Sequence, residues 1–475
     1  MIALPPADPA DVAGAALAQA LAAWRRSVAT ADARLPRLAI GLSGGIDSML
    51  LLDLGAGLAL ELGIELSALH VHHGLSPHAD AWAAFCAAEC AARGVPFALA
   101  RVAVARGGGT SVEAEARAAR HRAFAGLAVD AVALAHHADD QAETLLLQLL
   151  RGAGPPGLAA MPALRTPAGS PALVRPFLAL PRSLLNAAAV ERGLAWVEDE
   201  SNADLRLRRN YLRAEVAPRL AAAFPGYPQT LSRAAAHQAD AARLADELGA
   251  LDAAEGAGCD PVDGPTLSRA CLVRAAAVGG HRARNLLRWF LHRHALPAPS
   301  TARLDAMLQQ LTGAAPDARV RLAHGGVEVG VHRGQIMVHA PAVGWDEQRW
   351  TGEAAIDLPH GRLAFTVVQG GGIAVDRADS VGLDIRRRSG GERLRPGPGR
   401  ARQLLTHLVQ QHGIPAWRRD AWPLVFRNGA LVAVPGIGVD PAGASADGQP
   451  GIVVRWSLTP RQTLTAVKPA AGDPA

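Results

Sequence analysis

The stretch LAIGLSGGIDSMLLL, from Leu38 to Leu52, places the polar hexapeptide Ser-Gly-Gly-Ile-Asp-Ser between two apolar runs. The first run predicts a buried strand over 38–42, and the second predicts a helix over 47–62. Apolar runs of strand length then alternate with helical patterns as far as residue 150. This alternation predicts a doubly wound parallel sheet, with helices on both faces and ligands at the carboxyl ends of its strands.

The hexapeptide Ser43–Ser48 is therefore expected where the first strand ends and its helix begins. Backbone N–H groups in a first helical turn have no intrahelical partner, and the helix dipole favours an anion there. Gly44 and Gly45 let the backbone approach a phosphate closely, and the two serine hydroxyls can donate to phosphate oxygens. Asp47 is compatible with a bound anion when a cation such as Mg²⁺ lies between them. The stretch predicts a phosphate-binding loop, and a glycine turn capped by serine is the alternative.

The composition limits which nucleotide chemistry is available. Almost all basic residues are arginine, and Lys468 is the only lysine among the 475 residues. A Walker A loop is therefore excluded, and a Schiff-base lysine is disfavoured. The net charge of +5 favours an anionic partner without identifying it.

The same composition predicts two or three domains in which helices dominate. Hydrophobic residues make up 49% of the chain, and alanine and leucine supply most of them. No run of apolar residues is long enough to cross a membrane, the first residues do not form a secretion signal, and four cysteines give no disulfide framework. We expect a cytoplasmic protein.

The remaining element predictions are coarser. The predicted strands after the first cover 64–71, 97–104 and 130–135, and the predicted helices cover 11–29, 77–93, 111–127 and 138–150. We expect a long loop over Gly152–Pro176 because the segment is rich in glycine and proline. The pattern is helical from about residue 181 to 294, and it becomes strand-like in the last part of the chain, from about residue 343.

The hexapeptide resembles the PP-loop of ATP pyrophosphatases, Ser-Gly-Gly-x-Asp-Ser. The resemblance implies an adenine nucleotide alpha hydrolase-like domain that cleaves ATP between its α and β phosphates and holds the departing diphosphate. The ATP-binding residues that it implies are Ser43, Gly44, Gly45, Ile46, Asp47 and Ser48.

A second stretch, AHHADDQAETLLLQLLRGAGPPGL, resembles a signature of the tRNA(Ile)-lysidine synthetase family. Two further family patterns fit Glu115, Arg117 and Arg120, and then the stretch VEDESNADLRLRRNYLR. The residues from Arg386 to Asp440 are similar to the family's terminal domain. Departures from the family pattern include His72, Ser76, His121 and Ala160, which affect local contacts.

The resemblance implies a ligase that adenylates C2 of the wobble cytidine in the CAU anticodon of an isoleucine tRNA. The ε-amine of free L-lysine then displaces AMP and forms lysidine, so that the codon read changes from AUG to AUA. The implied catalytic residues are Asp47, Asp139, Asp140, Glu143, His136, Arg151 and Arg209. Asp47 and Asp140 are the candidates for Mg²⁺, with ATP as co-substrate. The family implies a monomer or a homodimer.

Several of these residues also have a purely structural interpretation. Asp139 and Asp140 open a predicted helix, where carboxylates are favoured by the helix dipole alone. The histidines at 70, 72 and 73 suit a pocket lining better than a zinc site. Cys86 and Cys90 are expected to pack in the core.

The stretch 386–402 contains seven arginines and one acidic residue, Glu392. A solvated basic loop is one interpretation, and contact with tRNA phosphates is the other. The predicted tRNA-binding residues are Arg386, Arg387, Arg388, Arg393, Arg395, Arg400 and Arg402.

The predicted organisation is a PP-loop catalytic domain over 1–225, a mainly helical tRNA-contacting domain over 226–345, and a small α+β tRNA-binding domain over 346–465. A disordered tail is expected over 466–475. Two alternative functions remain. A PP-loop tRNA thiolase would need reactive cysteines near the loop, and a tRNA-binding scaffold would not need the intact acidic cluster.

Overall fold

A computed structural model describes residues 8–28, 34–104, 112–167, 169–314, 320–374 and 382–460, arranged in two compact units, Met1–Arg243 and Leu244–Ala475. The predicted tail over 466–475 lies outside the described residues. None of the helices in these ranges has the length and apolar character needed to span a membrane.

The first unit is built on the predicted parallel sheet. The sheet has the order β3-β2-β1-β4-β6-β5, and its first five strands run parallel. The edge strand β5 pairs antiparallel to β6. The strands are β1 (Arg37–Gly41), β2 (Glu65–His72), β3 (Phe97–Arg101), β4 (Ala131–Ala133), β5 (Leu164–Arg165) and β6 (Ala172–Val174).

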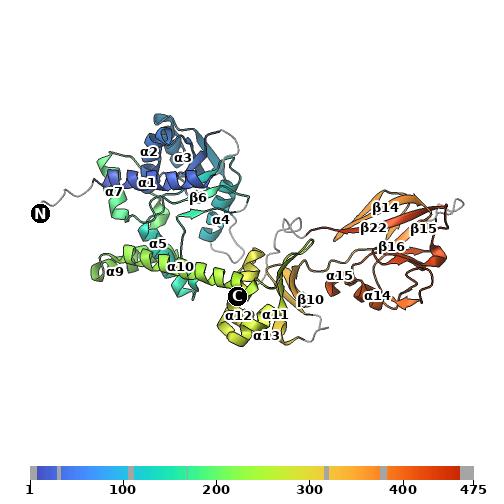
Figure 1. Ribbon diagram of the computed structural model, residues 1–475. Helices are drawn as coiled ribbons and strands as arrows, with labels where there is room; N and C mark the ends of the chain where they lie inside the picture. The colour runs from blue at the N-terminus through green and yellow to red at the C-terminus, as the bar shows by residue number, and fades with distance from the viewer. Residues whose placement is uncertain are drawn as a thin grey trace. The chain divides into compact units, whose positions relative to one another are not determined.

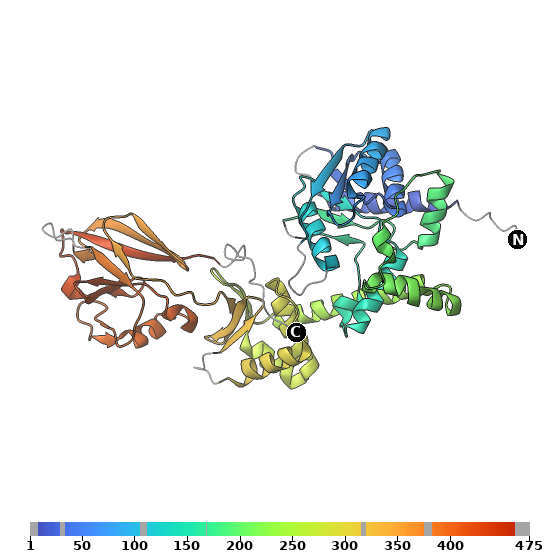
Figure 2. The same cartoon turned by 180° about the vertical axis from the view of Figure 1, so that it is seen from behind.

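Helices cover both faces of this sheet (Figures 1 and 2). On one face, α1 buries Leu17, Leu21 and Trp24, and α2 buries four consecutive residues from Met49 to Leu52. On the other face, Phe124 of α4 packs in a smaller core. The helices are α1 (Pro9–Ser27), α2 (Ile46–Glu61), α3 (Ala79–Ala92), α4 (Val112–Ala125), α5 (Ala138–Leu150), α6 (Pro155–Leu158) and α7 (Arg182–Glu191).

The alternation of strands and helices as far as residue 150 is confirmed. The prediction of one long loop over Gly152–Pro176 is wrong, because this segment contains α6, β5 and the fifth parallel strand, β6. Strand β6 has only three residues, all buried, and such a short apolar run carries too little periodicity to be recognised between prolines and glycines.

The strand order decides where a ligand binds. The central strand β1 pairs with β2 on one side and with β4 on the other. The chain reverses its direction of travel across the sheet between β1 and β4, and open α/β sheets bind ligands at such a point, outside the carboxyl ends of the strands. The loop after β1 and the loop after β4 are therefore the walls of the expected site.

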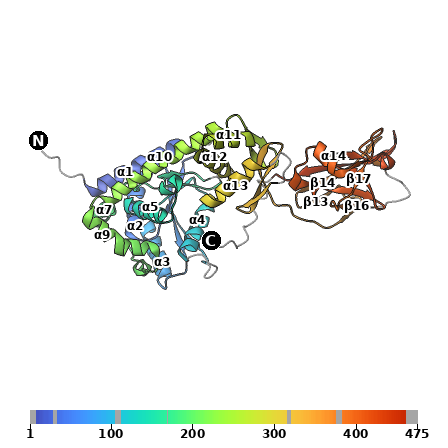
Figure 3. The ribbon, with the colours of Figure 1, turned by 90° about the horizontal axis from the view of Figure 1, so that it is seen from below.

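Short helices complete the first unit, and one long helix leads out of it. They are α8 (Arg208–Tyr211), a π-helical turn over Leu212–Val216, and α9 (Ala217–Ala223), followed by α10 (Tyr227–Ala253). Helix α10 runs without interruption through 27 residues (Figure 3).

The second unit begins with helices packed on a five-stranded antiparallel sheet, ordered β7-β8-β11-β10-β9. This sheet was not predicted, because the middle of the chain has a mainly helical pattern. Its elements are β7 (Ala257–Asp260), β8 (Gly264–Ser268), α11 (Arg269–Val278), α12 (Gly280–Arg293), α13 (Thr301–Gly313), β9 (Arg321–His324), β10 (Val327–His332) and β11 (Gln335–His339).

The last part of the chain is rich in strands, as predicted. Two sheets, ordered β12-β16-β19-β20-β21 and β13-β14-β22-β15, share one apolar core. The strands are β12 (Gln348–Trp350), β13 (Ala355–Leu358), β14 (Gly361–Gln369), β15 (Ile373–Ala374), β16 (Leu383–Arg386), β19 (Leu424–Arg427), β20 (Ala430–Val434), β21 (Gly438–Val439) and β22 (Pro450–Leu458). A two-stranded pair, β17 (Arg393–Leu394) and β18 (Gln403–Leu404), precedes the helices α14 (Leu405–Gln411) and α15 (Ala416–Arg419).

Candidate active site

The loop Ser43–Ser48 joins β1 to α2, where the sequence predicts it. The hydroxyl of Ser48 accepts hydrogen bonds from the backbone N–H groups of Ser43 and Gly44, both at 3.2 Å, and donates to the carbonyl of Gly45 at 2.9 Å. Within the described residues, the N–H groups of Ile46 and Asp47 have no acceptor. The first turn of α2 therefore presents free donors, as an anion site requires.

Gly44 is required by both its conformation and its surroundings. Its φ of +88° lies in the left-handed region that favours glycine. A Cβ at this position would lie 2.8 Å from Cγ2 of Val197 and 3.1 Å from Sγ of Cys86. The backbone of the loop is thus pressed against the segment that follows α7, and the N–H of Val197 donates to the carbonyl of Gly44 at 3.0 Å.

Asp47 lies in the first turn of α2 with a largely buried carboxylate, and its side chain keeps 23% of its surface exposed. Its Oδ1 has no hydrogen-bond partner, and its Oδ2 lies 3.8 Å from Nε2 of His137. Burial raises the pKa of Asp47, although His137 and Arg182 act in the opposite direction. A buried carboxylate with an unpartnered oxygen is costly in a folded protein, so this group is arranged for a ligand.

The first turn of α5 brings a second carboxylate to the same place. His137 caps this helix, because its Nδ1 accepts the N–H of Asp140 at 3.3 Å while Oδ2 of Asp140 accepts the N–H of His137 at 3.2 Å. Burial raises the pKa of Asp140, but His137 and His136 outweigh burial and hold it below the usual value. Asp140 is therefore an ionised carboxylate at neutral pH, and it lies beside Asp47 through the shared His137.

Asp139 and Glu143 lie on the same helix but have different partners. Oδ2 of Asp139 accepts the backbone N–H of Arg182 at 2.9 Å, at the start of α7. Glu143 is buried and receives two hydrogen bonds from Arg213, at 2.8 and 3.0 Å. Burial raises the pKa of Glu143, and Arg213 opposes this. The side chain of Asp139 keeps 28% of its surface exposed, which makes it the more accessible of the two.

His136 follows the end of β4 by three residues, and its side chain is half-buried. Burial lowers its pKa to about 3, although Asp140 opposes this, and Nδ1 has no partner. The ring is therefore neutral at physiological pH and can donate or accept a hydrogen bond without carrying charge. The described residues contain no group of three or more His, Cys, Asp or Glu side chains able to hold a metal ion.

The two predicted arginines of this region have different surroundings. Nη2 of Arg209 donates to Oγ1 of Thr144 at 3.1 Å, so Arg209 lies along α5 near the acidic residues. Arg151 is exposed at the C-terminal end of α5. With a rise of about 1.5 Å per residue, it lies roughly 20 Å from the first turn of that helix. The structure does not bring Arg151 to the loop.

Two arginines that the sequence analysis did not identify do lie at this edge of the sheet. Arg175 follows β6, is only 4% exposed, and donates to the carbonyl of Pro162 at 2.7 Å, while its Nε has no partner. Burial lowers the pKa of Arg175 to about 10, and Arg117 and Arg165 act in the same direction. Arg182 has a buried Nε without a partner, and its charge lowers the pKa of Asp47. A signal existed for Arg175, since a basic residue after a parallel strand faces the ligand edge, but it required recognition of β6.

The cysteines do not provide redox chemistry beside the loop. Cys86 and Cys90 are buried in α3, as predicted, and burial raises the pKa of Cys86 to about 12. A thiol with such a pKa is a poor nucleophile.

The predicted tRNA-binding arginines fall into two groups. Arg386 forms ion pairs with Glu347 and Asp384, and Arg388 donates to Thr406 at 2.7 Å and lies 3.6 Å from Glu392. These two residues are therefore paired within the domain. The exposed arginines are Arg387, Arg393, Arg395, Arg400 and Arg402.

Comparisons with known proteins agree with this architecture. Residues 19–220 match the PP-loop domain family, residues 276–337 match the TilS substrate binding domain, and residues 383–456 match the TilS substrate C-terminal domain. Three curated relatives each bear the name tRNA(Ile)-lysidine synthase. The relative from Nitrosomonas europaea is 39% identical over 431 residues, which cover 88% of this chain and 92% of that protein.

The other two relatives are equally similar. The relative from Chromobacterium violaceum is 41% identical over 426 residues, covering 86% of this chain and 93% of its own. The relative from Burkholderia pseudomallei is 40% identical over 455 residues, covering 86% and 91%. These matches support the ligase interpretation and give no support to the thiolase alternative. With its PP-loop, its acidic cluster and its terminal domain in the family's order, the chain belongs to the tRNA(Ile)-lysidine synthase family of PP-loop enzymes.

Proposed function

We propose that this enzyme uses ATP to activate the wobble cytidine of an isoleucine tRNA with a CAU anticodon and then joins free L-lysine to that base. The observation that carries the proposal is the geometry around Asp47. Its unpartnered oxygen lies beside free helix N–H groups, at the point of the sheet where a nucleotide is expected.

The first step is adenylation of the base. The O2 atom of cytosine attacks the α-phosphorus of ATP, the bond to the β-phosphate oxygen breaks, and diphosphate leaves. The N–H groups of Ile46 and Asp47 and the hydroxyl of Ser43 are placed to bind the departing phosphates. Arg182 and Arg175, which lie at this edge of the sheet, can offset the developing charge.

Mg²⁺ fits the residues present. Mg²⁺ prefers oxygen ligands and binds through one or two carboxylates together with substrate phosphates, which is the donor set that Asp47 and Asp140 offer. Both carboxylates lie within 4 Å of Nε2 of His137. When bound, the ion would neutralise phosphate charge.

The second step is attack by lysine. The ε-amine must lose a proton before its nitrogen attacks C2 of the adenylated cytosine and AMP leaves. Asp139 and Glu143 supply the negative charge that would receive the ammonium group, and Asp139 has the more exposed carboxylate. Arg213 fixes the orientation of Glu143 through its two hydrogen bonds.

We also propose that the exposed arginines between residues 387 and 402 contact tRNA phosphates, with domain boundaries near 225 and 345. The enzyme would act in the cytoplasm, as a monomer or a homodimer.

The test is AMP release from ATP by the full chain with bulk tRNA, measured with lysine and, separately, with a sulfur donor. Release that requires both lysine and tRNA supports the proposal. Release with the sulfur donor alone, or release independent of tRNA, would contradict it. Arg151→Ala serves as an internal comparison, because its position far from the loop predicts a much smaller effect than that of Asp47→Ala.

A further inference from the structure

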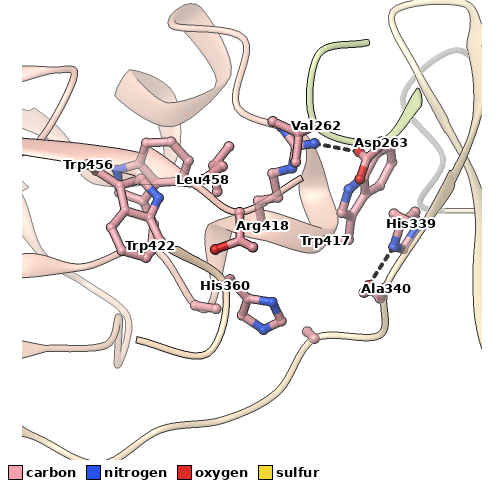
Figure 4. A pocket seen from close by; sticks show the side chains of 13 residues that line it. Val262, Asp263, His339, Ala340, His360, Trp417, Arg418, Trp422, Trp456 and Leu458 are labelled. Carbon is pink, nitrogen blue, oxygen red and sulfur yellow. Dashed lines mark hydrogen bonds and ion pairs between the residues drawn. The ribbon is translucent and has the colours of Figure 1, made fainter. Parts of the chain in front are cut away.

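A second site lies in the unit Leu244–Ala475, in a pocket whose walls are aromatic. Figure 4 shows Trp422 and Trp456 on one side of the pocket, Trp417 and His339 on the other, and Arg418 between them. The hollow measures about 510 Å³ when the open solvent at its mouth is included.

Each of the two walls is an aromatic pair. The rings of His339 and Trp417 stack with centroids 4.1 Å apart and planes 2° apart. The rings of Trp422 and Trp456 meet edge to face at 6.3 Å. Small residues, among them Ala340, leave the space between the pairs open. Aromatic walls of this kind suit a flat ligand.

Both walls contain buried polar atoms that the protein leaves unpartnered. The indole N–H groups of Trp417 and Trp456 have no acceptor among the described residues. Nδ1 of His339 donates to the carbonyl of Ala340 at 3.0 Å, so Nδ1 carries the proton. Burial lowers the pKa of His339 to about 4, the ring is neutral, and Nε2 is therefore a buried acceptor without a donor. His339 is 1% exposed.

The charge of the pocket excludes a free anion as its main ligand. Arg418 forms ion pairs with Asp260 and Asp263, which offset its charge. A pocket with two unpartnered indole donors and a cation whose charge is offset fits a neutral flat ring that has acceptors on its edge.

We propose that this pocket binds one unpaired nucleobase of the RNA substrate. The proposal rests on the proposed function, and it adds a recognition site separate from the PP-loop. Bases that are not paired in a helix can stack on aromatic side chains and hydrogen-bond through their edges, which is how proteins most often recognise RNA sequence. Five exposed arginines of the same unit supply the phosphate contacts that such recognition needs.

The experiment measures binding of a labelled single-stranded hexaadenylate and of bulk tRNA to the full chain over a range of salt concentrations. Trp456→Phe removes an unpartnered N–H without removing an existing hydrogen bond, and we expect hexaadenylate affinity to fall about fivefold. Trp422→Ala removes a stacking surface, and we expect a fall of about 5- to 100-fold. A base contact releases no phosphate counterions, so the slope of log affinity against log salt should stay the same.

The controls separate the pocket from the rest of the unit. Trp350→Phe changes a tryptophan that stacks on Phe365 outside the pocket and should bind both RNAs as the parent does. Ala342→Phe fills the exposed rim of the pocket without removing any of its groups, so it should weaken binding even if a tryptophan variant fails to fold. A double-stranded RNA with the same number of phosphates should not compete for the pocket.

The proposal is overturned if three variants bind RNA normally while thermal unfolding shows that each of them is folded. These variants are Trp456→Phe, Trp422→Ala and Ala342→Phe. Lysine incorporation by the parent enzyme is measured alongside. If the parent incorporates lysine while the variants bind normally, only the base pocket is wrong. If the variants lose binding while the parent incorporates no lysine, only the proposed reaction is wrong.

Discussion

Nε2 of His137 lies 3.8 Å from Oδ2 of Asp47, so the residue that caps α5 contacts the carboxylate that opens α2. The same nitrogen lies 3.4 Å from Oδ2 of Asp140. The two helices begin after β1 and β4, the adjacent strands between which the sheet reverses its order. One imidazole therefore holds together the two carboxylates on which the proposed chemistry depends.

Asp47→Asn should stabilise the free enzyme while it removes activity. The buried carboxylate has an unpartnered oxygen and a pKa raised by burial, so its charge opposes folding at neutral pH. In buffer without ATP and Mg²⁺, we expect the free energy of unfolding to rise by about 1 kcal/mol, while AMP release falls about 100-fold or more. Calorimetry and the AMP assay check the two effects.

Asp53→Asn is the matched control for that experiment. Asp53 forms ion pairs with Arg93 and Arg192, so its carboxylate is partnered in the folded protein. This variant should be less stable than the parent and should retain AMP release. Equal destabilisation of Asp47→Asn and Asp53→Asn would mean that the charge of Asp47 does not oppose folding.

Gly44→Ala should disrupt the loop. The φ of +88° strains any other residue, and the new Cβ would lie 2.8 Å from Val197. We expect a loss of about 1–3 kcal/mol in stability and a large rise in the KM for ATP. Gly57 is exposed in the middle of α2, and no atom lies within 4 Å of a Cβ added there. Gly57→Ala should therefore stabilise the protein by up to about 1 kcal/mol. A Gly44→Ala enzyme with a normal KM for ATP would argue against contact between this loop and phosphate.

The exposed arginines should act on tRNA through phosphate alone. Replacing Arg400 and Arg402 by alanine should reduce the salt slope of tRNA affinity by roughly 1 to 2, since each phosphate contact contributes about 0.7–0.9. Arg386→Ala should chiefly lower stability, because Arg386 is paired with Glu347 and Asp384. An unchanged slope in the double variant would reject the tRNA contact.

His339 should make the second unit sensitive to acid. Its pKa of about 4 lies below the ordinary value of 6.5, because burial disfavours the charged ring. The charged groups facing it are Glu328, which raises the pKa, and Arg418 and Arg321, which lower it. Between pH 6.5 and 4, the unfolded chain therefore binds a proton at His339 that the folded chain does not. The free energy of unfolding is unaffected by this residue above pH 6.5 and decreases as the pH falls toward 4.

The variant His339→Gln should consequently lose less stability than the parent between pH 6.5 and 4, by up to roughly 3 kcal/mol. Urea unfolding at several pH values measures the difference. His407→Gln, at an exposed position, should follow the parent curve. Parallel curves for all three proteins would show that His339 does not titrate in this way.

The parallel sheet could be predicted because its strands and helices alternate with clear periodicity. The run from Leu38 to Leu52 gave the position of the loop correctly, since a buried strand, a polar turn and a buried helix each have a distinct pattern. Strand β6 could not be predicted, because three buried residues carry no periodicity. The five-stranded sheet of the second unit was also missed, because its short strands lie among long helical patterns.

The site was predictable only where its residues are local in sequence. Asp47 and Asp140 follow strands, and the sheet order brings them together. The pairing of Glu143 with Arg213, by contrast, depends on how a π-helical turn packs on α5, and no spacing in the sequence predicts that contact. The distance of Arg151 from the loop follows from the length of α5. The predicted helix over 138–150 already implied this distance, although Arg151 was predicted to be catalytic.

The most direct test of the central claim is a crystal structure of the full chain with ATP and Mg²⁺. The account predicts the β and γ phosphates within hydrogen-bond distance of the backbone at Gly45 and Ile46, with the metal ion bound by Asp47. A triphosphate bound away from this loop would contradict it. In that case the Ser48 hydroxyl would still accept the N–H groups of Ser43 and Gly44.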